Sequence, residues 1–209
     1  MISALEALDR LRAGNRRFVD GLAGRGQLTD KARRSALVSG QAPFAIIHGC
    51  SDSRVPAELV FDQGLGDLFV IRVAGNVVAP SQIGSIEFAA ERFGTRLVVV
   101  LGHTQCGAVQ ATLEELERPS ERRSPNLHSI VDRIEPAVAT LFETDLRQDP
   151  TVLMRYAVRA NIRASVSHLR HGSRLLEHLI RQEGLLVVGA EYSLETGEVD
   201  FFEGVPRSR

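Results

Sequence analysis

The sequence predicts an α/β fold: a mainly parallel central sheet with an antiparallel edge strand, flanking helices and an N-terminal helical arm. Short apolar runs, typical of buried strands, occupy residues 44–47, 67–73 and 96–101. Between the second and third runs, residues 81–93 have the apolar spacing of a helix. Strand–helix–strand alternation requires crossover connections, so these strands are expected to lie parallel in one sheet.

The antiparallel edge is predicted from the last part of the sequence. Two further apolar runs, residues 185–189 and 198–202, flank a turn that contains Gly197. Strands joined by such a turn pair antiparallel, so the final strand is expected at the edge of the sheet. Because no internal repeat or long linker divides the sequence, residues 1–209 are predicted to form a single domain.

An amphipathic helix is predicted over residues 3–19. Ser3 is a suitable N-cap, Glu6 follows three residues later, and leucines recur at helical spacing. Glycines at positions 21, 24 and 26 end this helix, so residues 1–26 form the predicted arm. A second, basic helix is expected around residues 30–38.

The segment between the third and fourth strands is predicted to be mostly helical. Residues 107–117 continue as a helix, and residues 118–125 form an exposed loop. From residue 127 to about residue 181 the pattern is helical again. Breaks are expected near Pro136, Pro150 and Gly172.

Composition excludes several classes of protein. Among 209 residues, 25 are Lys or Arg and 26 are Asp or Glu, so the formal net charge is -1 and neither nucleic acid nor an anionic membrane is an expected partner. No apolar run approaches the roughly 20 residues that a membrane-spanning helix needs. The first residues lack the features of a signal peptide, and the sequence has 2 cysteines. The protein is therefore expected in the cytoplasm, a reducing compartment.

Metal-ligand side chains follow two of the predicted strands. Cys50 comes soon after the first run, and His103 and Cys106 come directly after the run at 96–101. Ligand sites in open parallel sheets form beyond the carboxyl ends of the strands. Two thiolates and one imidazole suit Zn²⁺ and leave one tetrahedral position open, which is typical of a catalytic site. The alternative is two buried, inert cysteines and an unrelated histidine.

Asp52 and Arg54 are expected to lie beside this site. They follow Cys50 at intervals of two residues and can form an ion pair in an extended turn. The carboxylate then either takes the fourth metal position or is held away from it by the guanidinium. Asp-x-Arg pairs elsewhere are mostly surface ion pairs of little energetic weight, so the position after the strand carries the interpretation.

These motifs together resemble the β-class carbonic anhydrases. The resemblance covers most of residues 41–113, and the matching segments are 50–55, 61–64, 72–76, 84–88 and 102–107. It implies reversible hydration of carbon dioxide to bicarbonate and a proton, by attack of zinc-bound hydroxide on carbon dioxide.

The resemblance also implies roles for particular residues. Cys50, His103 and Cys106 would hold Zn²⁺, and Asp52 with Arg54 would form a gating pair, with Asp52 joining the metal only in a closed site. The family's substrate-pocket positions are occupied by Gln41, Phe69, Ala74 and Gly107.

The resemblance further implies an assembly, either a homodimer or a dimer of dimers (a homotetramer). Gln41 would reach into the partner subunit's site, and the N-terminal arm would wrap over the partner. The apolar face of the arm is therefore expected to pack on a second subunit and not on the sheet of its own chain.

Some family members have a bicarbonate site made of Trp, Arg and Tyr. Arg72 and Tyr192 match, but Ile47 stands at the Trp position, so the resemblance does not extend to a complete site. His48, at the end of the first strand, is expected to be a hydrogen-bonded core residue rather than a proton shuttle.

Two alternative functions stay open at this level. Hydrolases of carbonyl sulfide or carbon disulfide resemble the same family and share its ligands. A catalytically silent zinc protein or redox sensor would also use Cys50 and Cys106. The joint presence of Asp52, Arg54 and Gln41 argues against this second alternative, because a silent protein needs no intact gate.

Overall fold

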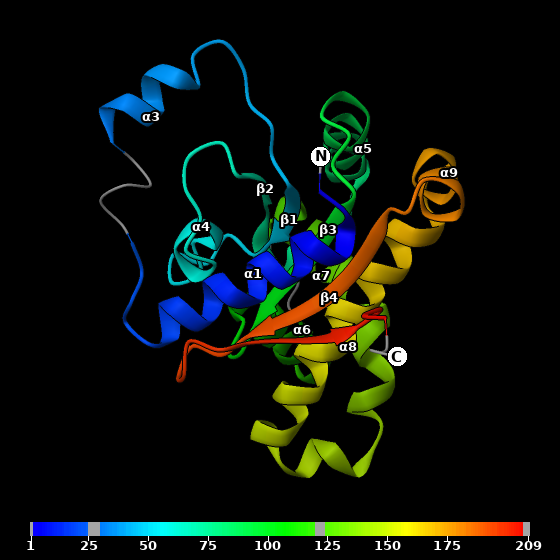
Figure 1. The fold of residues 1–209 in the computed structure, drawn as a ribbon. Coiled ribbons are helices and arrows are strands. Elements are labelled where there is room, and N and C mark those ends of the chain that lie inside the picture. The colour runs from blue at the N-terminus through cyan, green and yellow to red at the C-terminus, as the bar shows by residue number, and fades with distance from the viewer. Residues whose placement is uncertain (1, 25–29, 120–123, 207–209) are drawn as a thin grey trace.

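A computed structural model describes residues 2–24, 30–119 and 124–206 and shows the predicted α/β fold. One five-stranded sheet has the order β2-β1-β3-β4-β5 (Figure 1). The first four strands in this order are parallel, and β5 pairs antiparallel with β4. The strands are β1 (Ala45–Gly49), β2 (Leu68–Arg72), β3 (Leu97–His103), β4 (Leu186–Tyr192) and β5 (Val199–Glu203).

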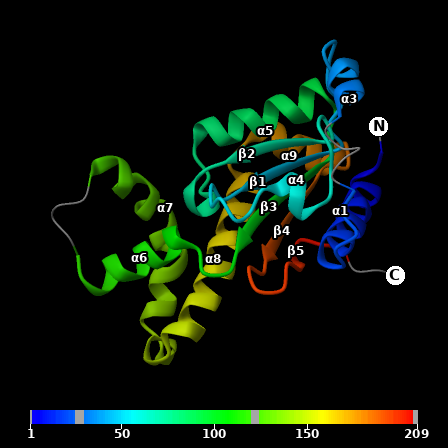
Figure 2. The ribbon, with the colours of Figure 1, turned by 90° about the vertical axis from the view of Figure 1, so that its left-hand side faces the viewer.

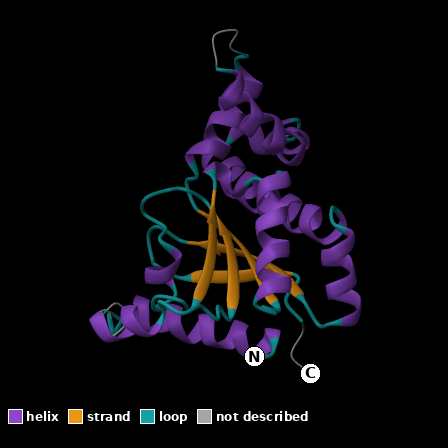
Figure 3. Cartoon of the chain, turned by 90° about the horizontal axis from the view of Figure 1, so that it is seen from above, coloured by secondary structure: helices purple, strands orange, loops and turns teal. Residues whose placement is uncertain are grey.

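Helices cover both faces of the sheet (Figures 2 and 3). Strands β1 and β3 are completely buried, and successive residues such as Ile46 and Ile47 belong to cores on opposite faces. One core is formed with α5 (Pro80–Arg92), α6 (Gly107–Glu117), α7 (Pro125–Phe142), α8 (Pro150–His171) and α9 (Arg174–Gln182). The other is formed with α1 (Ala4–Val19) and α4 (Ala57–Val60), while α3 (Lys31–Ala36) lies outside both.

The N-terminal helix α1 packs on the sheet of its own chain. Leu8 and Leu11 are 1% and 0% exposed, in the same core as β1 and β3. Gly14 allows a close approach, since a Cβ there would lie 1.8 Å from the Phe61 carbonyl oxygen. The apolar stripe of α1 therefore covers a sheet face that would otherwise have only the short α4. The prediction that the apolar face of this arm packs on a partner and not on its own sheet is therefore wrong for α1. Contact of its outer face with a partner stays a prediction.

Most predicted helix ends are confirmed. The Ser3 hydroxyl accepts from the Glu6 amide at the start of α1. Asp149 caps α8 directly before Pro150, and Gly172 follows the end of that helix. The predicted end of the arm at position 26 and the centre of the predicted loop, 120–123, lie outside the described residues.

The break predicted near Pro136 is wrong, because α7 continues through this residue. Proline removes one backbone donor, and its partner would be the carbonyl of Asp132, one turn earlier on the solvent side. Pro136 and Asp132 are both exposed, so water can replace the lost hydrogen bond. Val131, Ile134 and Val138 are buried before and after the proline, and their packing holds the helix in one piece.

Within the described ranges, none of the helices combines the length and apolar character needed to cross a membrane.

Candidate metal centre and active site

Parallel strand pairing brings the three predicted metal ligands together. Cys50 follows β1, His103 ends β3, and Cys106 is the N-cap of α6. The register places Gly49 beside Leu101, so the two strands end at the same edge of the sheet. The Sγ atoms of Cys50 and Cys106 are 4.0 Å apart, and one ligand atom from each of the three residues lies within 4.8 Å of the others. All three residues are buried.

The His103 ring is oriented as a ligand. Its Nδ1 lies 2.9 Å from the Thr104 carbonyl, which can only accept, so Nδ1 carries the proton. Nε2 then has a free lone pair, and it is buried with no hydrogen-bond partner among the described residues. An imidazole nitrogen and two cysteine sulfurs at this spacing are a donor set that fits Zn²⁺.

The two cysteines form an asymmetric pair. A hydrogen bond from Cys106 is the main cause that lowers the pKa of Cys50 to about 4, although burial opposes it. The same bond, followed by burial, raises the pKa of Cys106. The backbone N–H of Gly75 also points at Cys50 Sγ, at 3.4 Å. The protein thus stabilises a thiolate at position 50, which favours a cation in this place.

Asp52 and Arg54 form the expected ion pair at the edge of the cluster. Nε and Nη2 of Arg54 donate to the two carboxylate oxygens at 2.9 and 2.7 Å, and the Arg54 amide adds a third bond at 2.9 Å. This pairing is the largest cause that holds the pKa of Asp52 well below its usual range. The Oδ2 atom of Asp52 lies 3.8 Å from Nε2 of His103. The carboxylate is therefore ionised and held by Arg54, and one of its oxygens lies close to the ring nitrogen of His103 that faces the predicted metal position.

Arg72 fixes the loop that carries these residues. Its Nε donates to the Cys50 carbonyl at 2.9 Å and its Nη2 to the Asp52 carbonyl at 2.6 Å. Ile47 and Tyr192, the other positions compared with the bicarbonate site, belong to the core beside α1. Arg72 thus has a structural role, and its partners are backbone carbonyls.

A family model described as carbonic anhydrase matches residues 45–199. The chain belongs to the carbonic anhydrase family.

Relatives confirm this across most of the chain. A carbonic anhydrase 2 of Mycobacterium tuberculosis is 38% identical over 90% of this chain and 87% of its own length. A carbonic anhydrase of Mycolicibacterium smegmatis is 36% identical over 91% and 89%. The structure of the β-carbonic anhydrase CcaA has a TM-score of 0.75 at 27% identity and covers 98% of this chain and 94% of its own. The predicted β class is confirmed, and the protein is an enzyme, a lyase.

The four residues expected at the substrate pocket of the enzyme fall into two groups. Ala74 lies in the turn η1 (Ala74–Asn76), next to the Gly75 amide that faces Cys50, and Gly107 directly follows Cys106. Phe69 pairs in register with Ile46, about 13 Å along the strand from the position of Cys50, and packs on Phe88 and Phe93.

Gln41 is also distant from the metal ligands of its own chain. It is exposed and precedes β1, whose length of roughly 16 Å separates it from Cys50. The structure therefore brings Ala74 and Gly107 to the ligands of the same chain but not Gln41 or Phe69.

His48 is a core residue, as expected. It is 0% exposed, and its Nε2 lies 2.9 Å from the Asn76 carbonyl and 3.1 Å from that of Val77. Burial is the main cause that lowers the pKa of His48. The ring therefore stays neutral and ties β1 to the end of η1.

Sequence reasoning missed two polar residues behind the site, Asn161 and Ser165. Both are buried in α8, and both donate hydrogen bonds to carbonyls of η1. Their signal is a pair of polar residues spaced by four on the otherwise apolar face of a helix.

A buried carboxylate lies in β4, outside the cluster of predicted ligands. Glu191 is 8% exposed, Arg159 donates to its Oε2 at 3.0 Å, and Oε1 lacks a partner in the described part of the chain. Burial is the main cause that raises the pKa of Glu191; Asp200 adds to this, while Arg159 and Arg155 oppose it. Glu191 also lines a cavity of about 750 Å³ that extends to Thr104.

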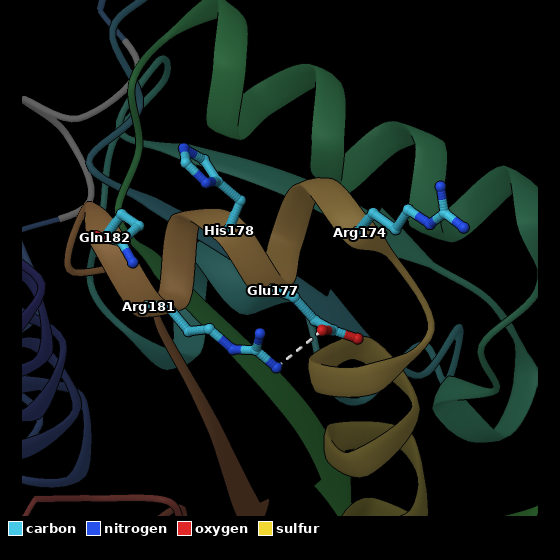
Figure 4. Close-up of a pocket in the computed structure, with 5 residues that line it drawn as sticks. All are labelled: Arg174, Glu177, His178, Arg181 and Gln182. Carbon is cyan, nitrogen blue, oxygen red and sulfur yellow. Dashed lines mark hydrogen bonds and ion pairs between the residues drawn. The ribbon is translucent and has the colours of Figure 1, made fainter.

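A smaller hollow of about 310 Å³ lies on the surface of α9 (Figure 4). Its lining residues all come from this one helix, and Arg181 is paired with Glu177 at 3.0 Å. Because α9 leads into the N-terminal end of β4, the hollow lies at the opposite end of the sheet from the metal ligands. It is a solvated helix face.

Proposed function

We propose that this carbonic anhydrase catalyses the reversible hydration of carbon dioxide to bicarbonate and a proton at a Zn²⁺ ion held by Cys50, His103 and Cys106. The observation that carries the proposal is the buried His103. One of its ring nitrogens lies within 4.8 Å of both cysteine sulfurs, its Nε2 has no hydrogen-bond partner in the described part of the chain, and an ionised carboxylate lies beside it. The donor set leaves one tetrahedral position for chemistry.

When bound, zinc supplies Lewis-acid chemistry that lowers the pKa of water and so provides a nucleophile near neutral pH. Two thiolates donate more charge than imidazoles, so a higher working pH is expected than for a site with three histidines. His103 keeps its lone pair on the metal side because Nδ1–H is engaged by Thr104.

Asp52 acts on the attacking oxygen through a hydrogen bond. Held by Arg54, the carboxylate remains ionised, so it accepts a hydrogen bond from the oxygen without taking its proton. Its position 3.8 Å from Nε2 of His103 suits a group that orients the nucleophile. We infer that Arg54 also keeps Asp52 off the metal, which makes the two residues a gate.

The complete substrate pocket is proposed to form between two subunits. Ala74 and Gly107 line it from the chain that holds the metal, and Gln41 and Phe69 reach it from the partner, because they lie far from the ligands of their own chain. One similar structure, from a study described as crystal structures of two tetrameric β-carbonic anhydrases of Sordaria macrospora, shares the fold at a TM-score of 0.72 and 22% identity, over 94% of this chain and 97% of its own. A homodimer or a dimer of dimers in the cytoplasm stays a prediction.

Metal analysis combined with stopped-flow measurement of CO2 hydration tests the proposal. We expect one zinc per chain and a rate that rises with pH across roughly pH 6.5–9, a window that brackets the pKa of water on zinc. The same preparation is assayed for hydrogen sulfide release from carbonyl sulfide and carbon disulfide. Release that exceeds CO2 hydration would replace the proposed substrate, and a chain without zinc would remove the mechanism.

A further inference from the structure

Two buried polar residues of α8 hold the turn that faces Cys50. Asn161 and Ser165 are 2% and 5% exposed and lie four residues apart, so both point from the same face of the helix. The Asn161 amide donates to the Gly75 carbonyl at 2.8 Å, and the Ser165 hydroxyl donates to the Asn76 carbonyl at 3.0 Å. Two successive carbonyls of η1 are thus fixed from α8.

Gly75 is the residue of this turn that reaches the metal ligand. Its N–H points at Cys50 Sγ at 3.4 Å, while its carbonyl is engaged by Asn161. Its φ of 67° is left-handed, and a Cβ would lie 2.8 Å from Cδ1 of Ile134, so glycine is required here. A glycine does not hold its own orientation, because its backbone is the most permissive. The Gly75 donor is therefore held by the turn's own hydrogen bond, from the Asn76 amide to the Val73 carbonyl at 3.0 Å, together with the bond from Asn161 outside the turn.

The position of α8 relative to the site is itself well defined. Ile162, next to Asn161, packs so closely on β3 that a Cβ at Gly102 would lie 2.5 Å from its Cδ1. Gly102 directly precedes the ligand His103. Because α8 packs this closely on β3, which carries His103, its position is fixed. Asn161 on α8 can therefore restrict the movement of the Gly75 N–H that faces Cys50.

We propose that Asn161 is a positioning residue for the metal centre, which holds Gly75 so that its N–H stays on the Cys50 sulfur. This inference rests on the proposed metal centre. A hydrogen bond from the Gly75 N–H orients the Cys50 sulfur and stabilises the charge of a metal-bound thiolate. Loss of such an outer partner lowers metal affinity by roughly 10–100-fold.

The test compares Asn161→Ala with a matched control, Asn15→Ala. Asn15 is also a buried helical asparagine, and its amide donates to the carbonyls of Val60 and Gly197, on the other side of the sheet. Zinc affinity is measured by competition with a chromophoric chelator, and the sulfur-to-metal charge-transfer band is recorded after loading with Co²⁺. Neither readout uses carbon dioxide, so a failure of the proposed reaction leaves them interpretable.

We expect Asn161→Ala to bind zinc about 10–100-fold more weakly and to shift the cobalt band to lower energy, because the sulfur loses a hydrogen bond. Asn15→Ala should lose stability but keep the affinity and band of the parent. Ser165→Ala, a milder change to the same turn, should move both readouts in the direction of Asn161→Ala by less, and it decides the matter if Asn161→Ala does not fold.

Parental affinity and an unshifted band in a folded Asn161→Ala protein would overturn the inference while leaving the metal centre intact. Equal losses in Asn161→Ala and Asn15→Ala would also overturn it, because general destabilisation would then explain both. A parent chain that binds neither Zn²⁺ nor Co²⁺ would overturn the proposed metal centre and this inference with it.

Discussion

Truncation of Leu11 to alanine tests whether α1 belongs to the core of its own chain. Leu11 is 0% exposed between α1 and the sheet. Leu→Ala at such a site costs roughly 2–5 kcal/mol, because the transfer free energy is lost and a cavity remains. At about 2.1 cal/mol/K of unfolding entropy per residue, the 209-residue chain has about 0.44 kcal/mol/K, so the expected fall in Tm is about 5–11 °C.

Thermal unfolding followed by circular dichroism, at low and at high protein concentration, measures this fall. Leu5→Ala is the matched control, since Leu5 lies in the same helix but is 54% exposed, and its Tm should change by about 1 °C or less. Because α1 packs within its own chain, the gap in Tm between Leu11→Ala and the parent should not depend on concentration. An unchanged Tm, or a gap that widens on dilution, would refute the reasoning by placing Leu11 elsewhere or in a contact between subunits.

Three further predictions concern the site and the sheet. Cys106→Ser should lose stoichiometric zinc, because a hydroxyl does not replace a thiolate ligand; full occupancy by metal analysis would contradict the ligand set. Arg54→Ala should keep zinc but hydrate carbon dioxide on the order of 10–100-fold more slowly, since Asp52 loses the partner that orients it, and undiminished turnover in a zinc-replete variant would rule out the gate. Glu191→Gln should flatten the dependence of stability on pH. Burial raises the pKa of Glu191 in the folded state above its value in the unfolded state, so the fold is more stable when this carboxyl is protonated. The contribution of Glu191 to stability is full below its unfolded-state pKa and is lost as pH rises through its folded-state pKa. A series of Tm measurements from mildly acidic to neutral pH checks this, and an unchanged slope in the variant would count against it.

The grouping of the three proposed metal ligands could be predicted from sequence because parallel strands end at the same edge of the sheet. Cys50 and His103 follow apolar runs directly, so strand pairing alone brings them together, and Cys106 is carried along by the short loop after His103. Asp52 and Arg54 needed no long-range information either, because they interact within a single turn. Local pattern and topology were sufficient for these five residues.

Contacts between distant elements could not be predicted in this way. Asn161 meets Gly75 across 86 residues of sequence, and that contact exists only once α8 has packed on the sheet. The amphipathic pattern of α1 specifies an apolar face but not the surface that it covers, and the family resemblance placed that surface on a partner. Pro136 shows the same limit, since a proline's effect on a helix depends on whether the freed carbonyl faces water.

The attachment of α1 has a consequence for synthesis of the chain. Asn15 bonds to Gly197 and Val199, which are 182 and 184 residues further along, so the first helix is anchored by the last hairpin. At roughly 5–20 residues per second, α1 leaves the ribosome about 10–40 s before these partners exist. During that interval α1 can already cover β1, α4 and β3, but its two hydrogen bonds to the last hairpin cannot form. The native attachment of α1 is thus complete only after the hairpin of β4 and β5 has formed.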